Sequence, residues 1–125
     1  MKELTKAEEQ VMQYLWSIEK GFLKDIVDQY PDPKPAYTTI STVIRVLVKK
    51  GFIGHNTYGK INEYYPLVTK NKYTKSFFKR MVDTYFNKSQ KQFASFFAQE
   101  SNMSIEELED LKSLIDQTIK EKKND

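Results

Sequence analysis

The 125-residue sequence contains no cysteine and a single histidine, His55. Without cysteine there are no disulfides, thiolate metal sites or cysteine nucleophiles, and one histidine excludes most histidine-based metal sites and catalytic triads. Paired carboxylates with catalytic spacing and a glycine-rich loop for phosphates are also missing. We therefore expect a protein that is not an enzyme and that carries neither a metal ion nor another cofactor.

Long apolar runs are absent as well. No stretch approaches the roughly 20 apolar residues that are needed to cross a bilayer. The first ten residues lack the basic and then apolar layout of a signal peptide. Hydrophobic residues make up 39% and charged residues 30% of the chain, a balance typical of a globular, soluble protein. These features predict a cytoplasmic protein without a membrane-inserted segment.

Acidic residues are nearly missing from the middle of the chain. Between Lys34 and Arg80 there are ten Lys or Arg residues and one acid, Glu63, which gives a net charge of +9. From Met81 to Asp125 six basic and nine acidic residues give −3. The asymmetry favours a polyanion-binding segment followed by a segment with another task, although a solvated basic surface without a partner fits the charge alone.

The N-terminal residues predict an amphipathic helix. Thr5 and Glu8 have the spacing of a capping box, so the helix is expected to begin near Thr5, and Gly21 is expected to stop it. Its apolar stripe, widened by aromatic neighbours, is expected to face the core. The stripe consists of Leu4, Ala7, Val11, Leu15 and Ile18.

Two further helices are expected on either side of a proline-rich turn. The second covers about residues 23–29, and the segment 31–35, with three prolines, cannot be helical. The third runs from about Tyr37 to Lys50 and ends at Gly51.

This third helix has two distinct faces. One is apolar, has the width of a buried stripe, and comprises Ile40, Val43, Ile44 and Leu47. The opposite face carries hydroxyl and cationic side chains, namely Thr38, Ser41, Thr42, Arg45 and Lys49. Short hydroxyls permit close approach, and longer cations reach phosphates or guanine edges, so this face suits a groove of DNA.

A β-hairpin is expected directly after the third helix. One strand begins at Phe52 and Ile53, residues 61–66 supply the second, and Gly59 lies near the turn. Helix, helix, turn, helix and hairpin follow one another in the order of a winged helix-turn-helix. We predict a mainly α fold with a small β-hairpin, divided into a winged-helix DNA-binding domain (residues 1–68) and a helical dimerisation region (residues 69–125).

Three more helices are expected in the C-terminal part. Thr69 caps one that runs to about Phe86, the next covers about residues 89–99, and Ser104 with Glu107 forms a capping box for the last. Their apolar surface has no obvious partner within the chain, which favours a homodimer. The residues expected at this interface are Phe77, Met81, Tyr85, Phe93, Phe96, Phe97, Leu108, Leu111, Ile115 and Ile119.

The residues expected to contact double-stranded DNA come from the third helix and the wing. They are Tyr37, Thr38, Thr39, Ser41, Thr42, Arg45, Lys49, Lys50, Tyr58 and Lys60. An alternative is a winged-helix module that binds a protein partner and for which the basic face is incidental.

Three aromatic or basic features have two interpretations each. His55 is interpreted as an ordinary polar strand residue rather than as a phosphate-contacting or pH-sensitive group. Trp16 is interpreted as a core residue rather than as one that stacks on a base. The phenylalanines of residues 93–97 are interpreted as packing residues rather than as the lining of a ligand pocket.

Three segments resemble one known family. They are residues 38–53 (TTISTVIRVLVKKGFI), residues 4–16 (LTKAEEQVMQYLW) and residues 64–68 (YYPLV). Together they are similar to the penicillinase repressor family, the BlaI/MecI/CopY group, over nearly the whole chain. The resemblance implies a dimeric repressor of palindromic operators that controls a resistance or stress gene, often together with a membrane sensor that has a metalloprotease domain.

Two positions depart from the family pattern. Family members usually have an arginine where this chain has Val46, whereas its own cation lies one position earlier at Arg45. Antibiotic-responsive members are cleaved at an Asn-Phe bond in the tail, and the nearest equivalent here is Phe96-Phe97. The operator sequence and the mode of release are therefore expected to differ, and the copper-responsive branch's cysteine-rich C-terminus has no counterpart.

Overall fold

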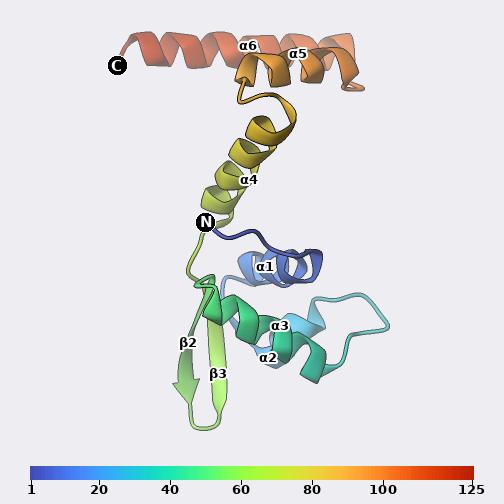
Figure 1. Cartoon of the computed structure of the whole chain (residues 1–125), viewed down its shortest axis with the longest axis vertical. Coiled ribbons are helices and arrows are strands. Elements are labelled where there is room, and N and C mark those ends of the chain that lie inside the picture. The colour runs from blue at the N-terminus through green and yellow to red at the C-terminus, as the bar shows by residue number, and fades with distance from the viewer. The chain divides into compact units, whose positions relative to one another are not determined.

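The computed structural model describes all 125 residues, which form two compact units, Met1–Arg80 and Met81–Asp125 (Figure 1). The boundary between the units lies within a helix, α4 (Lys70–Tyr85). The division of roles expected at residues 68 and 69 stays a prediction. No helix of the chain combines the length and the apolar character that a membrane crossing requires.

The first helix, α1 (Lys6–Ile18), begins at the predicted capping box. The Glu8 amide donates to Thr5 Oγ1 at 3.2 Å, and the Thr5 amide donates to Glu8 Oε1 at 2.9 Å. The expected stop at Gly21 is wrong, because the helix ends at Ile18 and its C-cap residue Glu19 has a φ of 70°. Gly21 is buried instead, and a Cβ there would lie only 2.9 Å from Ile18 Cδ1, so the glycine permits close packing.

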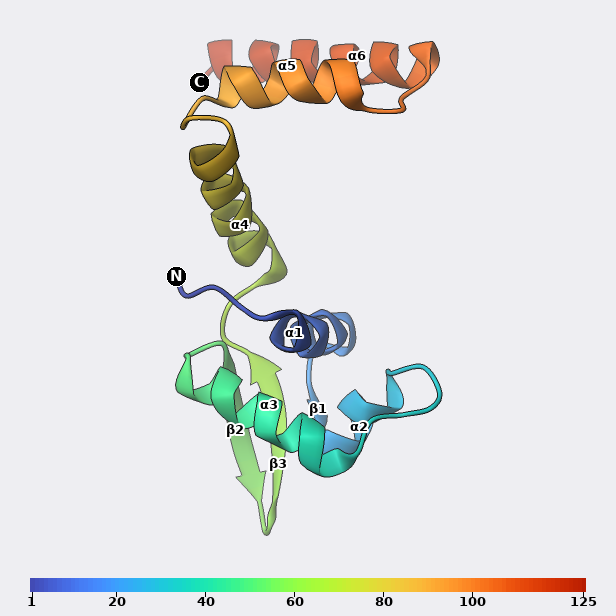
Figure 2. The same cartoon turned by 45° about the vertical axis from the view of Figure 1, so that its right-hand side comes forward.

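The predicted hairpin is part of a three-stranded antiparallel sheet, whose third strand the sequence did not predict. Its order is β1 (Gly21–Phe22), β3 (Ile61–Pro66) and β2 (Ile53–Tyr58), so that the short β1 pairs with the outer side of β3 (Figure 2). The hairpin itself is confirmed, and Gly59, with φ 63°, supplies the backbone conformation for the tight turn between Tyr58 and Ile61.

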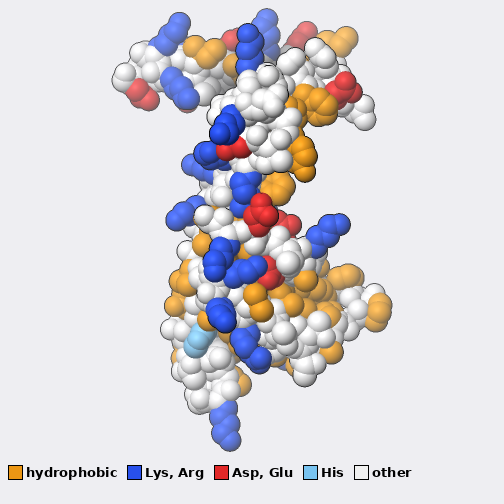
Figure 3. All heavy atoms as spheres, viewed as in Figure 1, with side chains coloured by type: hydrophobic (Ala, Val, Ile, Leu, Met, Phe, Trp, Pro, Cys, Tyr) orange, Lys and Arg blue, Asp and Glu red, His pale blue; other side chains and the backbone are white.

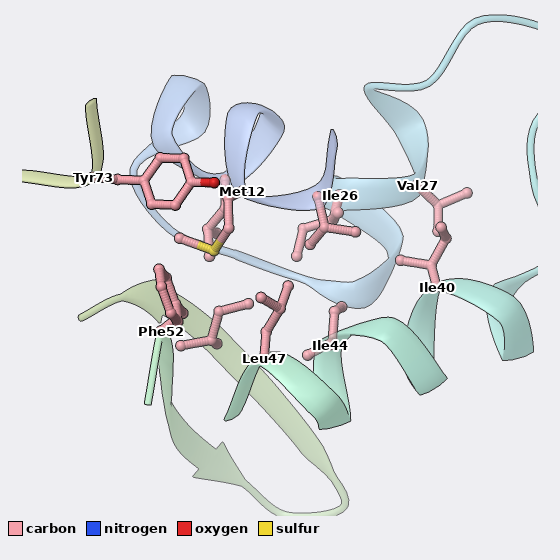
Figure 4. Packing of buried hydrophobic residues seen from close by; sticks show 11 residues of the cluster. Met12, Ile26, Val27, Ile40, Ile44, Leu47, Phe52 and Tyr73 are labelled. Atoms are coloured by element: carbon pink, nitrogen blue, oxygen red, sulfur yellow. The ribbon is translucent and has the colours of Figure 1, made fainter. Parts of the chain in front are cut away.

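The core of the first unit lies where α1, α2 (Leu23–Asp28), α3 (Tyr37–Lys49) and the sheet meet. Side chains from α3 point toward those of α1 and α2 (Figure 4). The buried cluster comprises Val11, Met12, Leu15, Ile26, Val27, Ile40, Ile44, Leu47, Phe52, Ile53 and Tyr73. The inward face predicted for the third helix is confirmed, with Val43 only partly buried.

The predicted stripe of the first helix is wrong at one position. Ala7 is exposed, and its neighbour Glu8 is buried, with 7% of its side chain accessible. Lys50 Nζ lies 2.6 Å from Glu8 Oε1, so the carboxylate is paired inside the protein. Burial alone raises the pKa of Glu8, but hydrogen bonds from Lys50 and Thr5, together with attraction to Lys50, outweigh burial and hold the pKa below its usual value.

Two aromatic side chains join the start of α4 to this core. Trp16 Nε1 donates to the Val68 carbonyl oxygen at 2.8 Å, and its ring centroid lies 5.8 Å from that of Tyr73. The Tyr73 hydroxyl donates to Glu9 Oε2 at 2.5 Å, and burial together with this bond raises the pKa of Tyr73 to about 12. The predicted packing role of Trp16 is therefore confirmed.

The second unit contains the end of α4, α5 (Gln90–Glu100) and α6 (Ile105–Lys123). The cap at Ser104 and its box with Glu107 are confirmed, and Ser89 caps α5. Phe86 lies at the centre of an aromatic cluster, with ring centroids 5.5 Å from Phe93 and 5.4 Å from Phe96. No residue of α5 or α6 is fully buried.

Because Lys50 pairs with the buried carboxylate of Glu8, its substitution is predicted to lower the stability of the fold, whereas substitution of the neighbouring Lys49 is not. Lys50→Met leaves the Glu8 carboxylate buried without its cation, so we expect the free energy of unfolding at neutral pH to fall by about 2–4 kcal/mol. The matched variant Lys49→Met alters an exposed side chain and is expected to change it by less than about 0.5 kcal/mol. Equilibrium unfolding in urea measures both.

The same pair sets a pH dependence. Because the folded pKa of Glu8 lies below the unfolded value, the wild-type pair stabilises the fold above about pH 4.5, and this stabilisation is lost as the pH falls through the folded pKa. In Lys50→Met the part of this contribution that comes from Lys50 is lost, and only the hydrogen bonds from Thr5 still favour the Glu8 carboxylate. Equal stability of the Lys49 and Lys50 variants at neutral pH would contradict the structural role of the pair.

Candidate nucleic-acid interface

The outer face of α3 is polar and accessible. Thr38, Thr39, Thr42, Arg45 and Lys49 are exposed there. Residue Ala36 at the N-cap provides no side-chain hydrogen bond to the first turn, unlike the capping residues of α1, α5 and α6. Helix amides without a side-chain cap, at the positive end of the helix dipole, favour an anion.

One hydroxyl of this face is partly engaged. Thr42 Oγ1 donates to the Thr38 carbonyl oxygen at 2.9 Å, so its hydroxyl hydrogen is turned toward the helix backbone. Its oxygen lone pairs and its methyl group remain outside that bond. These groups are suited to an amino group or a thymine methyl on a base edge. Tyr37 begins the helix and is 48% exposed.

The wing extends the same cationic surface. Tyr58 and Lys60 flank the exposed turn at Gly59. In the view of Figure 3, the surface over α3 and the wing shows Lys, Arg and His side chains and no acidic side chain. This agrees with the charge of +9 that the sequence assigns to residues 34–80.

A groove of about 260 Å³ separates α3 from the wing. Its wall on α3 is formed by Ser41, Ile44, Arg45 and Val48, and its wall on the wing by His55, Asn62 and Tyr64. The strand register explains the second wall, since His55 lies directly opposite Tyr64 and Thr57 opposite Asn62, which puts all four on one face of the sheet.

Lys50 does not belong with the exposed cations. Its ammonium group is bound to Glu8 of α1, and it also donates to the Glu3 carbonyl oxygen at 3.3 Å. The side chain of Lys50 is partly buried and paired with Glu8, and its contact with DNA stays a prediction. Sequence reasoning missed His55 and Asn62 as groove residues, because their facing depends on the register of the hairpin, which the turn determines.

The residues expected at a dimer interface divide into two groups. Exposed are Phe77, Tyr85, Phe96, Phe97, Ile115 and Ile119. Partly buried are Met81, Phe93, Leu108 and Leu111. In α6, Ile115 is 51% exposed although its side chain is apolar. Such accessible apolar side chains on one helix face are typical of surfaces that associate.

The sequence model of the penicillinase repressor family matches residues 4–117, which is nearly the whole chain. This chain belongs to the penicillinase repressor family. As a member, the protein is a winged-helix, DNA-binding transcriptional repressor, and the resemblance of its sequence segments to that family is confirmed.

Two curated relatives are similar over almost their full length. The methicillin resistance regulatory protein MecI of Staphylococcus aureus strain N315 is 30% identical to the repressor over 118 residues, covering 90% of this chain and 93% of MecI. MecI of Mammaliicoccus sciuri is 29% identical over the same shares. The solution structure of the DNA-binding domain of the repressor BlaI, 25% identical, superposes with a TM-score of 0.50 over 58% of this chain and 94% of that domain.

The exposed face of α3 predicts the effect of one substitution in the repressor. Arg45→Ala removes a long cation from the exposed side of α3 without touching the core, so we expect affinity for operator DNA to fall about tenfold to a hundredfold. Lys6→Ala removes one positive charge from α1 and serves as the matched control, with an expected change of less than about threefold. Gel-shift titration measures both, and equal losses for the two variants would exclude a specific role for Arg45.

Proposed function

We propose that the repressor binds palindromic operator DNA as a homodimer and blocks transcription from the adjacent promoter. The observation that carries this proposal is the two-sided helix α3. Its inner side is held by the core through Ile40, Ile44 and Leu47, and its outer side offers hydroxyls and cations beside a basic wing. A helix held in this way can enter a major groove as one rigid element.

The contacts on DNA divide by chemistry. In the proposal, one group of α3 side chains contacts base edges or the nearest phosphates: Thr38, Thr39, Ser41, Thr42 and Arg45. The other group contacts mainly phosphates: Tyr37, Lys49, Tyr58 and Lys60. Base contacts provide sequence specificity, and phosphate contacts provide affinity and position α3 on the duplex. Relatives usually have an arginine at the position of Val46. In the proposal Arg45, one position earlier, makes the DNA contact of that arginine.

Pairing of two copies is proposed for the C-terminal region. The apolar residues of α6 repeat on one face at Leu108, Leu111, Ile115 and Ile119, and the last two are about half exposed. Covering that face with the same face of a second copy removes apolar surface from water, which stabilises a symmetric dimer. A dimer in turn places two α3 helices on two half-sites of a palindrome.

The family resemblance supports a membrane sensor with a metalloprotease domain as the proposed signalling partner. The repressor itself is proposed to act in the cytoplasm and to have no enzymatic activity. The bond equivalent to the one that is cleaved in relatives, Phe96-Phe97, lies inside α5. Proteases require an extended substrate, so cleavage there would follow local opening of α5. Control of a resistance or stress operon fits this arrangement.

Footprinting on the DNA upstream of the repressor's own gene tests the function. We expect two protected half-sites about one helical turn apart. We also expect the affinity to fall by roughly 10³ between about 50 and 200 mM salt, because several phosphate contacts release counterions. Absence of protection even at low salt would instead favour the alternative of a protein-binding winged helix.

A charge introduced on the α6 stripe tests the dimer. Ile115→Glu places a carboxylate in the proposed interface, so we expect sedimentation velocity to show a monomer at concentrations where the wild type is a dimer. Ser113→Glu adds the same charge to a side of α6 away from the stripe, and it is expected to leave the dimer intact. A dimeric Ile115→Glu variant would remove this face from the interface.

A further inference from the structure

The groove between α3 and the wing has the chemistry of an anion site. Arg45 contributes a guanidinium, Ser41 and Tyr64 contribute hydroxyls, and His55 contributes an imidazole. No carboxylate is among the lining residues. A volume of about 260 Å³ holds a phosphate group with several waters, because one water occupies roughly 30 Å³ of liquid.

Asn62 adds a donor to this groove. Thr57 Oγ1 donates to Asn62 Oδ1 at 2.8 Å, across the two wing strands. This bond engages the amide oxygen and leaves the amide NH₂ as the hydrogen-bonding group of Asn62. The wing side of the groove thus presents an NH₂ group and an imidazole, while α3 presents a guanidinium from the opposite wall.

The position of His55 is fixed by its cross-strand neighbour. His55 pairs with Tyr64, and their ring centroids lie 6.2 Å apart in an edge-on arrangement. The one acidic residue of β3, Glu63, is paired with Asn56 and therefore lies on the other face of the sheet.

Charges near His55 from the surrounding elements are positive. On α3, Arg45 lines the groove and Lys49 follows one turn later, while β1 contributes only Gly21 and Phe22, which carry no charge. On the wing, Lys60 lies at the turn, and Tyr64 is the titratable group opposite. An imidazolium at this position therefore has no carboxylate partner in the groove and would gain one anionic partner from DNA.

We propose that His55 contacts a backbone phosphate of operator DNA in this groove, together with Arg45 and Asn62, and that protonation of His55 tightens operator binding as the pH falls. The inference rests on the proposed function and names a DNA contact beyond it. Neutral imidazole offers one donor, whereas imidazolium offers two donors and a positive charge. Because the phosphate favours the charged form, DNA binding and proton uptake strengthen each other.

The affinity for operator DNA at about pH 8 and about pH 6 tests the proposal, since this range spans the titration of histidine. We expect the wild-type dissociation constant to fall roughly tenfold on going to the lower pH, at constant salt. His55→Gln keeps an NH₂ donor but cannot be protonated, so it is expected to lose the pH dependence and to bind at about pH 6 roughly tenfold more weakly than the wild type. His55→Lys is expected to bind tightly at both pH values.

A second variant moves the histidine to the other face of the wing. In the double variant His55→Gln, Asn56→His the chain still has one histidine, but it lies beside Glu63 and away from the groove. We expect this variant to show the pH-independent binding of His55→Gln. A pH dependence that persists in either variant would overturn the inference, as would equal wild-type affinity at both pH values.

The same titrations distinguish a failure of the proposed function from a failure of the role of His55. If the wild type binds no operator DNA at either pH, the proposed function itself is wrong. If it binds at about pH 8 and does not gain affinity at about pH 6, the function stands and the role of His55 does not. The exposed position of His55 makes the substitutions compatible with folding, and circular dichroism of each variant verifies this.

Discussion

The burial of one side of α3 is the constraint on which the first unit depends. Ile40, Ile44 and Leu47 are almost inaccessible, and they pack against side chains of α1, α2 and the sheet. Each such side chain contributes about 1.5–3 kcal/mol of hydrophobic stabilisation relative to an exposed one, so rotation of the helix about its axis is strongly disfavoured. The rotation in turn fixes which side chains face solvent. The packing of the core thus determines which side chains α3 offers to a binding partner.

Two successive lysines at the end of α3 show how sharply this rotation separates roles. Lys49 is exposed and extends the outer face, whereas Lys50, about 100° further around the helix, turns toward α1 and pairs with Glu8. The pairing links the cap of α1 to the end of α3, because Glu8 also accepts from the backbone and donates its own amide to Thr5. One carboxylate therefore closes a helix cap and anchors a second helix.

Much of the fold follows from local sequence signals. Capping boxes at Thr5 and Ser104 and the period of the α3 stripe predict helices that the structure confirms. Burial of Glu8 was not predictable, because its partner Lys50 lies 42 positions away and a helical stripe favours Ala7. The pairing of Gly21 with Tyr64 was not predictable either, because these two residues also lie far apart in the sequence. The exposed face of α3 is predictable from the spacing of its apolar residues. The groove is not, because the hairpin register decides that His55 and Asn62 face the groove that Arg45 also lines.

Tyr73 determines where the first unit of this repressor can be joined to a different C-terminal region. It belongs to α4, yet it lies in the core of the first unit against Phe52 and Trp16 and donates to Glu9. A chimaera that joins this DNA-binding part to a relative's tail immediately after Val68 replaces a core residue together with the tail. A junction after Arg80 preserves it. The exchangeable module of this repressor therefore ends later than its last β-strand, because the core of the first unit includes a residue of α4.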